Sequence, residues 1–495
     1  MIINTINCSL TDFACDALII NLFEGVTMPG GGTGAVDRAV NGLISRTINK
    51  ENFSGKLAET LILRNCKGIK SDTIVVVGLG KQADFGIDQM IKASSAAARE
   101  CEKINAKKIG TILHGSGIGG FSHYESAKSL TIGSLLGLYR FDKHKTKEKS
   151  DNKVEEITIV EIDGTKISDI EKGISTGSII GEAVNKSRDL SNEPSNYLNP
   201  KTLADFASDI AKKYNLSCTI LDRESIEEKG MGLVSAVSRG SSDEPYFIDI
   251  RYTSPNAKKT VAIVGKGVTF DTGGYSLKTA DKMYGMKDDM SGAAAVLCAM
   301  EAVGKAKPLV NVIAIVPAVT NEIGNKSIHP GDVFTSLSGQ TVEINNTDAE
   351  GRLILADALT YAAREGADEL IDIATLTGAC IIALGRGISG IIGNDSKLVN
   401  DLIRCGAKCC EIFWQLPLYE DYISLLKSET ADFINAPGQE GGAITAGLFI
   451  SQFVENKTWA HLDLSSIETK TETLTSRVGS TGVGTGTLVS YLLDI

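Results

Sequence analysis

The stretch TVAIVGKGVTFDTGGYSLK, Thr260–Lys278, is the part of the sequence that decides the fold. It begins with an apolar run of strand length, VAIV, and continues directly into a polar segment that is rich in glycine. In open α/β sheets, ligands bind at the loops beyond the carboxyl ends of the strands. The stretch therefore predicts a buried strand of such a sheet, with the chemistry of the protein located just after it.

Apolar runs of similar length alternate with helical patterns through the rest of this half of the chain. The predicted strands are PYFIDIRY, TVAIVGKG, VNVIAIVPAV, ELIDIATL and WAHLDLSS, and the predicted helices include GAAAVLCAMEAVGKA and LILADALTYAAREG. This alternation is typical of α/β layers with a largely parallel sheet.

The N-terminal part of the chain shows the same alternation. Its predicted strands are DALIINLF, ETLILRN, TIVVVGLG, KIGTILHG and VEEITIVEI, and its predicted helices are AVDRAVNGLISRTI, DQMIKASSAAARECEKI and ESAKSLTIGSLLGLYRF. The polar, lysine-rich stretch from Asp142 to Lys153 has the composition of an exposed loop.

The length of the chain, 495 residues, requires more than one domain, because a single hydrophobic core stops growing at about 250 to 300 residues. We predict an N-terminal α/β domain over residues 1–165 that shapes access and assembly, a linking helix over 166–190, and a catalytic domain over 191–495. Each domain is expected to be a mainly parallel or mixed sheet flanked by helices, and the larger C-terminal one carries the chemistry.

Composition narrows the class of protein. Hydrophobic residues make up 42% and charged residues 22% of the chain, as in ordinary globular proteins. The net charge of −11 disfavours non-specific attraction to nucleic acid or to an anionic membrane. The start, MIINTINCSLTDF, lacks the pattern of a signal peptide, and no run approaches the ~18 apolar residues of a membrane span. We therefore expect a cytoplasmic protein whose ten cysteines are reduced thiols.

Acidic residues gather in two places that follow predicted strands. Asp271 lies in the polar segment, and Asp289 stands eleven positions after Lys278. After the strand TVEI, the segment NNTDAEGRLILADAL sets Asp348, Glu350 and Arg352 at alternate positions in a turn before an amphipathic helix, and alternate positions of an extended backbone face the same way. Because these acids follow predicted strands of one sheet, our hypothesis is that the four carboxylates converge; they are Asp271, Asp289, Asp348 and Glu350.

A convergence of this kind requires cations. Two carboxylates ~4 Å apart repel each other by about 4 kcal/mol at an effective dielectric constant of 20. Two divalent ions would balance four such charges, and oxygen ligands suit magnesium, manganese or zinc. A zinc site built from histidine is disfavoured, because none of the five histidines has a partner at ligand spacing; they are His114, His123, His144, His329 and His461.

Each feature also has a simpler interpretation when it is taken singly. A DAE triplet before a helix is usually an N-cap arrangement, Lys266 and Lys278 could be solvated lysines, and Arg352 could pair with a nearby acid. PGGGTG (Pro29–Gly34) and VGLGK (Val77–Lys81) complete neither GxGxxG nor GxxxxGK, so we expect plain turns there. His461 lies in an apolar strand, which favours a hydrogen-bonded core histidine.

Together these segments resemble one known family. NTDAEGRL, Asn346–Leu353, looks like the signature of the leucyl aminopeptidase (cytosol aminopeptidase) family of dinuclear metallopeptidases, and GKGVTFDTGGYSLK and MKDDMSGAAA match at the same spacing. The resemblance runs from about Ser191 to the C-terminus and includes NEPSNYLNP, DIATLTGA, ADFINAPG and WAHLDLSS. The N-terminal part is only loosely similar.

The resemblance implies a metal ligand set at five positions. The tighter site would use Lys266, Asp271, Asp289 and Glu350, and the more exchangeable site would use Asp271, Asp348 and Glu350. A lysine ligand must be neutral, and removing its proton near pH 7 from a pKa of about 10.4 costs roughly 4 to 5 kcal/mol. The charge of the metal together with burial would supply that shift.

The implied activity is removal of the N-terminal residue, with leucine and similar apolar residues favoured, from short peptides. Water activated by two metal ions would attack the carbonyl, Lys278 would act as the electrophile, and Arg352 would hold a bicarbonate that relays protons. The implied cofactors are two divalent ions per subunit, Mn or Zn with Mg or Co also compatible, and bicarbonate. The positions that match the substrate pocket are Met286, Asn346, Thr375, Leu376 and Gly378. The family forms hexamers, so a homohexamer is expected.

Three positions depart from the family pattern. Tyr275 and Thr279 stand where a small or aliphatic residue and a proline are more frequent, and Ser291 stands where glycine is frequent. None of them is an implied metal ligand, so they bear on side-chain preference and loop shape.

Two alternative functions stay open at this point. Paired carboxylates serve a two-metal phosphoesterase equally well, although Lys266 and the complete NTDAEGRL argue against it. A binding module is the other alternative, because some members of the family also bind DNA and the N-terminal domain could hold a nucleotide. The acidic composition disfavours the DNA version.

Overall fold

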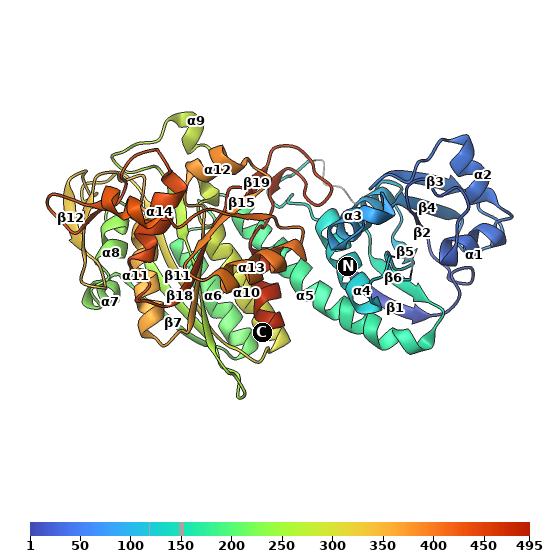
Figure 1. The fold of residues 1–495 in the computed structure, drawn as a ribbon, viewed down its shortest axis with the longest axis horizontal. Helices are drawn as coiled ribbons and strands as arrows, with labels where there is room; N and C mark the ends of the chain where they lie inside the picture. Colours follow the sequence, from blue (N-terminus) through green and yellow to red (C-terminus); the bar gives the residue numbers. More distant parts are fainter. Residues whose placement is uncertain (118, 148–152) are drawn as a thin grey trace. The chain divides into compact units, whose positions relative to one another are not determined.

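A computed structural model describes residues 1–117, 119–147 and 153–495 and divides the chain into two compact units. Unit 1 comprises Met1–Asn185, Ala407–Cys410 and Lys470–Val478, and unit 2 comprises Lys186–Gly406, Glu411–Thr469 and Gly479–Ile495. Both are α/β structures, which confirms the predicted fold class (Figure 1). The loop expected from Asp142 to Lys153 lies partly outside the described residues, at 148–152, and residues 143–147 and 153 are exposed.

Unit 1 is built on a six-stranded sheet that is parallel except at one edge. The strand order is β1 (Ile2–Asn7), β6 (Glu156–Glu161), β5 (Lys108–Thr111), β2 (Ala17–Leu22), β4 (Thr73–Gly78) and β3 (Thr60–Arg64), and only β3 runs antiparallel to its neighbour. Its helices are α1 (Gly31–Ala39), α2 (Leu43–Lys50), α3 (Ile87–Lys103), α4 (His123–Leu138) and the part of α5 (Ile167–Asn192) that precedes Lys186.

Helices cover both faces of this sheet, as the alternation along β2 shows. Ile19 belongs to a buried cluster with residues of α3, whereas Leu18 and Ile20 belong to a cluster with residues of α1 and α2. Successive side chains of a strand point to opposite faces, so strands buried on both sides must be apolar throughout. This explains the continuous apolar run ALIINL, which only Asn21 interrupts.

The helices that follow β2 differ from the sequence prediction in two ways. AVDRAVNGLISRTI forms two helices instead of one, because Asn41 and Gly42 adopt left-handed backbone with φ of 56° and 74°. Glycine and asparagine adopt this conformation at low cost, and it ends an α-helix. The prediction of a plain turn for PGGGTG was also wrong, because Gly31–Gly34 form the first turn of α1.

Unit 2 is built on a nine-stranded mixed sheet. Its strand order is β16 (Phe413–Gln415), β15 (Ser389–Gly393), β18 (Thr458–Asp463), β14 (Glu369–Ala374), β9 (Thr260–Gly265), β11 (Asn311–Asn321), β8 (Tyr246–Tyr252) and β7 (Ser217–Leu221), with β10 (Gly267–Asp271) also paired to β11. The four central strands β18, β14, β9 and β11 are mutually parallel. Their carboxyl ends therefore meet at one edge of the sheet.

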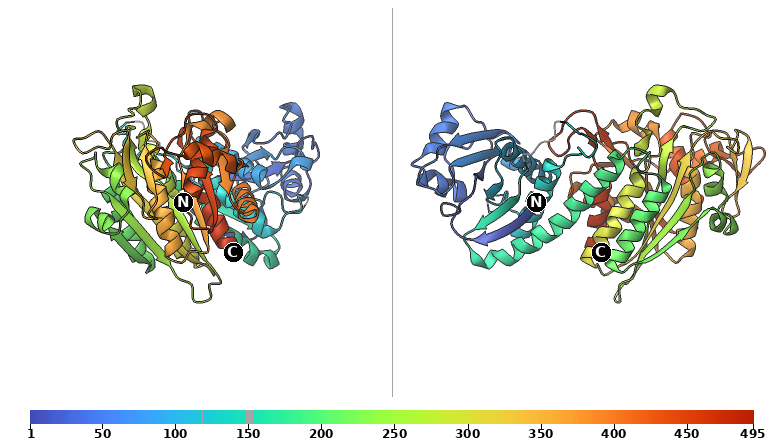
Figure 2. Two further views of the ribbon diagram at one scale, coloured as in Figure 1. Left: turned by 60° about the vertical axis from the view of Figure 1, so that its left-hand side comes forward. Right: turned by 180° about the vertical axis from the view of Figure 1, so that it is seen from behind.

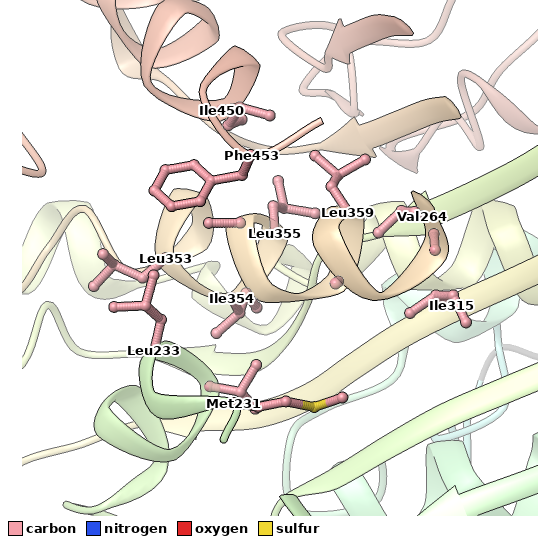
Figure 3. Packing of buried hydrophobic residues seen from close by; sticks show 14 of the residues in the cluster. Met231, Leu233, Val264, Ile315, Leu353, Ile354, Leu355, Leu359, Ile450 and Phe453 are labelled. Atoms are coloured by element: carbon pink, nitrogen blue, oxygen red, sulfur yellow. The ribbon is translucent and has the colours of Figure 1, made fainter. Parts of the chain in front are cut away.

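The two faces of this sheet carry different helices (Figures 1 and 2). Helices α6 (Pro200–Tyr214) and α10 (Ser291–Ala306) pack on one face, and α8 (Gly232–Ser238) and α11 (Gly351–Arg364) pack on the other. On the α11 face, Leu355 and Leu359 lie among Val264 of β9, Ile315 of β11 and Phe453, which follows α14 (Gly442–Ser451) (Figure 3). The buried face of α11 thus fixes the helix whose N-terminus follows the DAE triplet.

The remaining elements of unit 2 are short or peripheral. They are α7 (Arg223–Glu228), α9 (Ala280–Met283), the 3-10 helix η3 (Met286–Asp288), β12 (Asp332–Thr335), β13 (Thr341–Ile344), α12 (Gly378–Leu384), α13 (Ser396–Ala407), the 3-10 helix η4 (Glu420–Leu426), β17 (Phe433–Ile434), β19 (Glu468–Thr469), β20 (Gly479–Ser480) and α15 (Thr485–Asp494). Among the residues that the structure describes, no helix combines the length and the apolarity needed to cross a membrane.

The packing of α11 leads to a first prediction. Leu355→Ala should lower the free energy of unfolding of unit 2 by about 2 to 5 kcal/mol, because it opens a cavity at a fully buried position. Urea unfolding followed by the fluorescence of Trp459 and Trp414, which both lie in unit 2, measures this change. The control Leu309→Ala removes an exposed side chain and should change stability by less than about 0.5 kcal/mol. Equal effects of the two substitutions would contradict the packing.

Candidate metal centre

The site lies where strand β9 gives way to β10, at the carboxyl edge of the sheet. Lys266 stands between the two strands: its backbone N–H donates to Ile373 of β14 (3.1 Å) and its carbonyl accepts from the N–H of Ala293 of α10 (2.9 Å). Beyond it, β10 pairs with β11 and shifts register between Val268 and Asp271. Such irregularities commonly re-aim side chains beside functional sites, and here Lys266 and Asp271 come from the two ends of β10.

The ammonium group of Lys266 lies among three acceptors. Its Nζ is 2.7 Å from Asp289 Oδ1, 2.8 Å from Glu350 Oε1 and 3.0 Å from the carbonyl oxygen of Thr375. The side chain is only 4% exposed. A Cβ added at Gly351 would lie 2.8 Å from Nζ, so a side chain there would force the end of Lys266 to move from this position.

The carboxylate of Asp271 is held from several sides. Its Oδ1 accepts from the N–H of Gly273 (2.8 Å) and from Asn321 Nδ2 (2.8 Å), and its Oδ2 is 2.6 Å from Lys278 Nζ. Lys278 also forms an ion pair with Asp348. The structure therefore places Lys278 between Asp271 and Asp348.

Three of the four predicted acids converge, and the fourth, Asp289, contacts Lys266, although the local geometry differs from the one expected. One carboxylate oxygen from each of Asp271, Asp348 and Glu350 lies within 4.8 Å of the other two. The expectation that Asp348 and Glu350 face the same way on extended backbone was wrong. Asp348 lies in a turn, and Glu350 has helical backbone (φ −75°, ψ −35°) at the start of α11. The turn and the first helical turn together aim both side chains inward.

Asn435, which immediately follows β17, holds this turn in place. Its Nδ2 donates to the carbonyl oxygens of Asn346 (2.7 Å) and Ala349 (3.3 Å), and its Oδ1 accepts from the N–H of Asn345 (3.0 Å). Its own carbonyl oxygen accepts from Arg352 Nη1 (2.7 Å). Asn435 is fully buried, so one residue holds the DAE turn through its side chain and the guanidinium group of Arg352 through its backbone carbonyl.

The electrostatics of the cluster reflect crowded acids in a buried place. Burial, with Glu350 adding to it, raises the pKa of Asp271 to about 6, and burial raises the pKa of Asp289 well above its ordinary value. Burial also acts to raise the pKa of Glu350, but Lys266 and Lys278 outweigh it and the pKa is lowered. Conversely, burial acts to lower the pKa of Lys266, and the neighbouring Asp289 and Glu350 reverse this and raise it.

The donor set fits divalent cations. Asp289 Oδ2 and Glu350 Oε2 are buried and have no hydrogen-bond partner among the described residues. A buried carboxylate oxygen without a partner is costly. Four carboxylates face only two lysines, so the cluster keeps an excess of negative charge that hard cations with oxygen ligands would balance. The residues present therefore match a site for such ions.

Two of the predicted substrate-pocket residues, Thr375 and Asn346, contact this cluster. Thr375 is in direct contact, because its Oγ1 donates to Asp289 Oδ1 (2.6 Å), and the side chain of Asn346 accepts from the N–H of Asp348 (2.9 Å). Leu376 is partly buried against the core of unit 2. Met286 is half-buried at the start of η3, and Gly378 is exposed at the start of α12.

Three further residues position the site but carry no assigned role in the sequence analysis. Asn321 joins Asp271 to the carbonyl oxygen of Thr347 (3.0 Å), and Asn435 clamps the DAE turn. Asp463 accepts from the N–H groups of Leu376 and Thr377, both at 3.2 Å. All three lie at or next to the carboxyl ends of strands, and this is the signal that could have found them.

The structure shows the surroundings of His461 and of the three residues that depart from the family pattern. His461 is fully buried with Nδ1 2.5 Å from Asp372 Oδ1, which confirms a hydrogen-bonded core histidine. Tyr275 is exposed and stacks on His329 with ring centroids 4.9 Å apart. Thr279 is the N-cap of α9, and Ser291 donates to the carbonyl oxygen of Asp288 (2.6 Å).

Comparison with known proteins gives full-length matches. The model for the catalytic domain of the cytosol aminopeptidase family matches residues 185–489, and the model for the N-terminal domain of that family matches residues 19–148. A probable cytosol aminopeptidase of Alkaliphilus oremlandii (strain OhILAs) is 38% identical over 483 residues, 97% of this chain and 96% of the relative. Another, of Geobacter sulfurreducens, is 38% identical over 496 residues, 99% of both chains.

Two solved structures extend the likeness to the fold. A mutant of tomato leucine aminopeptidase aligns with a TM-score of 0.89 and 34% identity, over 100% of this chain and 96% of that one. The bottromycin maturation enzyme BotP in complex with Mn aligns with a TM-score of 0.86 and 29% identity, over 97% of this chain and 99% of that one.

The excess of acid in the site leads to a second prediction. Mn²⁺ added to protein stripped of metal with EDTA should stabilise it, by about 2.7 kcal/mol when the metal concentration is 100 times the Kd. Glu350→Gln should abolish most of this effect, because it removes a charge from the centre of the cluster. Thermal unfolding with and without Mn²⁺ measures the difference.

The matched control for this experiment is Glu411→Gln. Glu411 is also buried, but it lies outside the acidic cluster. Its carboxylate accepts hydrogen bonds from the N–H groups of Gly486 and Thr487 at the start of α15. Its substitution should lower the stability of the protein and leave the stabilisation by Mn²⁺ intact. An undiminished Mn²⁺ effect in Glu350→Gln would rule out the proposed ligand set.

Proposed function

The chain belongs to the cytosol aminopeptidase family, and we propose that it removes N-terminal leucine and similar apolar residues from short peptides by means of two divalent metal ions. Membership makes it a metallo-aminopeptidase, a hydrolase of the leucyl aminopeptidase type. The observation that carries the two-metal proposal is the convergence of Asp271, Asp348 and Glu350. Asp289 is linked to this group by Lys266, which contacts both Asp289 and Glu350.

The proposed ligands divide into two overlapping sets. Lys266, Asp271, Asp289 and Glu350 would hold one ion, and Asp271, Asp348 and Glu350 would hold the other. Support for the first set is the pair of contacts from Lys266 Nζ to Asp289 and Glu350, together with the unpartnered second oxygen of each acid. The lysine would bind as a neutral amine, which needs the field of the ions to remove its proton.

The bound metal ions would activate the water and the scissile bond, and the side chains of the protein would hold the ions. When bound, two divalent ions polarise the scissile carbonyl, make water nucleophilic at neutral pH and anchor a free α-amine, so that only a chain terminus is accepted. Manganese or zinc is proposed, and the Mn named with the similar BotP structure supports manganese. Magnesium and cobalt suit the same type of donor set.

Lys278 is the proposed electrophile for the oxygen of the scissile carbonyl. Its ammonium group contacts both Asp271 and Asp348, and 13% of its side chain is exposed. Burial acts to lower its pKa, but Asp271 and Glu350 outweigh burial and raise it, so the group is a cation at neutral pH. A fixed cation of this kind would stabilise negative charge that develops on oxygen.

Arg352 is the proposed holder of a bicarbonate that relays protons. Its Nη1 is engaged by Asn435, whereas its Nε is buried and has no partner among the described residues, so it is free to donate to a small anion. Burial lowers the pKa of Arg352 to about 10, so the guanidinium group stays charged at neutral pH. A planar guanidinium group suits bidentate binding of a carboxylate-like anion.

The substrate side of the proposal rests on residues beside the cluster. Met286, Asn346, Thr375, Leu376 and Gly378 would line the pocket for the N-terminal side chain. Leu376 and Met286 would supply apolar surface, which suits leucine, while Asp463 holds the backbone of Leu376 in place. We further propose a homohexamer and a cytoplasmic location, the latter in keeping with the names of the curated relatives.

Substrate choice provides a third prediction and the direct test of this function. Protein loaded with Mn²⁺ should hydrolyse leucine p-nitroanilide and leave p-nitrophenyl phosphate intact, because the site would anchor an α-amine next to the scissile carbonyl. N-acetyl-leucine p-nitroanilide should be inert for the same reason and serves as the matched control. Turnover of the phosphate ester alone would overturn the assignment in favour of a phosphoesterase.

Lys278 gives a fourth prediction. Lys278→Ala should lower kcat for leucine p-nitroanilide by about 10² to 10³, with KM changed less and with the metal content measured by atomic emission unchanged. The control Lys282→Ala removes an exposed lysine of the neighbouring helix α9 and should leave kcat as it is. Loss of metal in proportion to loss of activity in Lys278→Ala would show that this lysine holds the metal site together instead.

A further inference from the structure

Unit 1 contains a cavity of about 480 Å³ that the peptidase chemistry does not use. Residues after the carboxyl ends of five parallel strands line it: Ser9 after β1, Phe23 after β2, Leu79 after β4, Ile112 after β5 and Ile162 after β6. Ligand pockets typically have volumes of about 300 to 1,000 Å³. The cavity therefore has the size and the position of a small-molecule site in an α/β sheet.

The topology of the sheet points to the same place. Strands β2 and β5 are parallel neighbours in the sheet. The chain leaves β2 toward β4 on one side, whereas it leaves β5 toward β6 on the other side. In open parallel sheets, ligands bind in the crevice at such a reversal of strand order. The cavity is lined by residues from directly after both strands, Phe23 and Ile112.

Two glycine-rich segments supply backbone groups to the cavity. Gly30 is the N-cap of α1, Gly31 and Gly32 lie in its first turn, and Gly115 and Gly117 follow β5. A Cβ added at Gly30, Gly31 or Gly117 would meet nothing within 4 Å, so the backbone there faces open space. No side chain caps the N-terminus of α1, and its first turn carries no acidic residue. Free N–H groups at the start of a helix favour an anion.

The rest of the lining restricts the anion to a particular class. Apolar side chains such as Leu10, Phe23, Val26 and Ile112 make up much of the wall, so a bare phosphate would leave most of the cavity unfilled. The described lining residues include no lysine or arginine, and they include one acid, Glu161. A ligand must thus combine an anionic group for the glycine amides, an apolar ring for the wall and hydroxyls for a carboxylate.

We propose that this cavity binds a nucleoside diphosphate. The phosphates lie against the backbone amides at Gly30–Thr33, and the nucleoside lies against the apolar wall with its sugar hydroxyls near Glu161. The volume of the cavity and the reversal of strand order carry this proposal, and the helix N-terminus places the phosphates within the cavity. The site is separate from the proposed metal centre, since every lining residue belongs to unit 1.

Calorimetric titration of the full-length protein with ADP tests the proposal. EDTA is kept in the buffer so that the acidic cluster of unit 2 cannot contribute through a metal-bound phosphate. We expect saturable binding of ADP with one site per chain, and at least tenfold weaker binding of adenosine and of inorganic phosphate. Adenosine or phosphate binding as tightly as ADP would overturn the proposal, and so would the lack of any heat from millimolar ADP.

Matched variants locate the binding site. Gly30→Glu places an acid where the phosphates would lie and should weaken ADP binding at least tenfold. Gly86→Glu makes the same change at the N-cap of α3, which also has extended backbone but does not line the cavity. The affinity of this variant for ADP should stay within twofold of that of the parent protein. Val26→Trp, in a loop, fills the cavity from the apolar side and should also weaken binding tenfold.

Folding of each variant is checked by its thermal unfolding midpoint. If Gly30→Glu fails to fold, Val26→Trp decides between the outcomes. Undiminished ADP binding by a folded Gly30→Glu or Val26→Trp protein would place the nucleotide elsewhere and end the proposal.

Discussion

The repulsion among buried carboxylates is the constraint on which the catalytic unit depends. Asp271, Asp289 and Glu350 are all nearly inaccessible to solvent, and the only described cations in contact with them are the ammonium groups of Lys266 and Lys278. Pairs of such charges repel by several kcal/mol in a protein interior. The fold must therefore hold the acids in place at an energetic cost that divalent ions would remove.

The architecture meets that cost by attaching each acid to a different rigid element. Asp271 ends β10, Asp289 precedes α10, and Glu350 starts α11, whose other end is buried against β9 and β11. Neutral side chains lock the connections: the amide of Asn321 ties Asp271 to the DAE turn, and the amide of Asn435 holds that turn, while the backbone carbonyl of Asn435 accepts from Arg352. These amides donate hydrogen bonds without adding charge, so they orient the acids and leave their excess of negative charge for the ligand.

In both units the candidate ligand site lies at the carboxyl edge of a set of parallel strands, but the two sites favour ligands of opposite charge. In unit 2 this edge gathers acids that suit cations. In unit 1 it gathers glycines and an uncapped helix start, and the described lining of its cavity includes a single acid. The same sheet geometry thus supports a cation site in one unit and the proposed anion site in the other, because the loop residues alone decide the charge.

The sequence by itself determined the α/β class and the central strands, since apolar runs such as VAIV are local properties of the chain, and the resemblance carried by GKGVTFDTGGYSLK and NTDAEGRL identified the clustered acids. It did not determine the break at Asn41 and Gly42, the short strands β1, β10 and β15, or the helical backbone of Glu350. Only the tertiary structure decided the roles of Asn321, Asn435 and Asp463, because their partners lie 26 to 90 positions away along the chain. Contacts across such separations arise from the packing of strands and helices, and no local pattern encodes them.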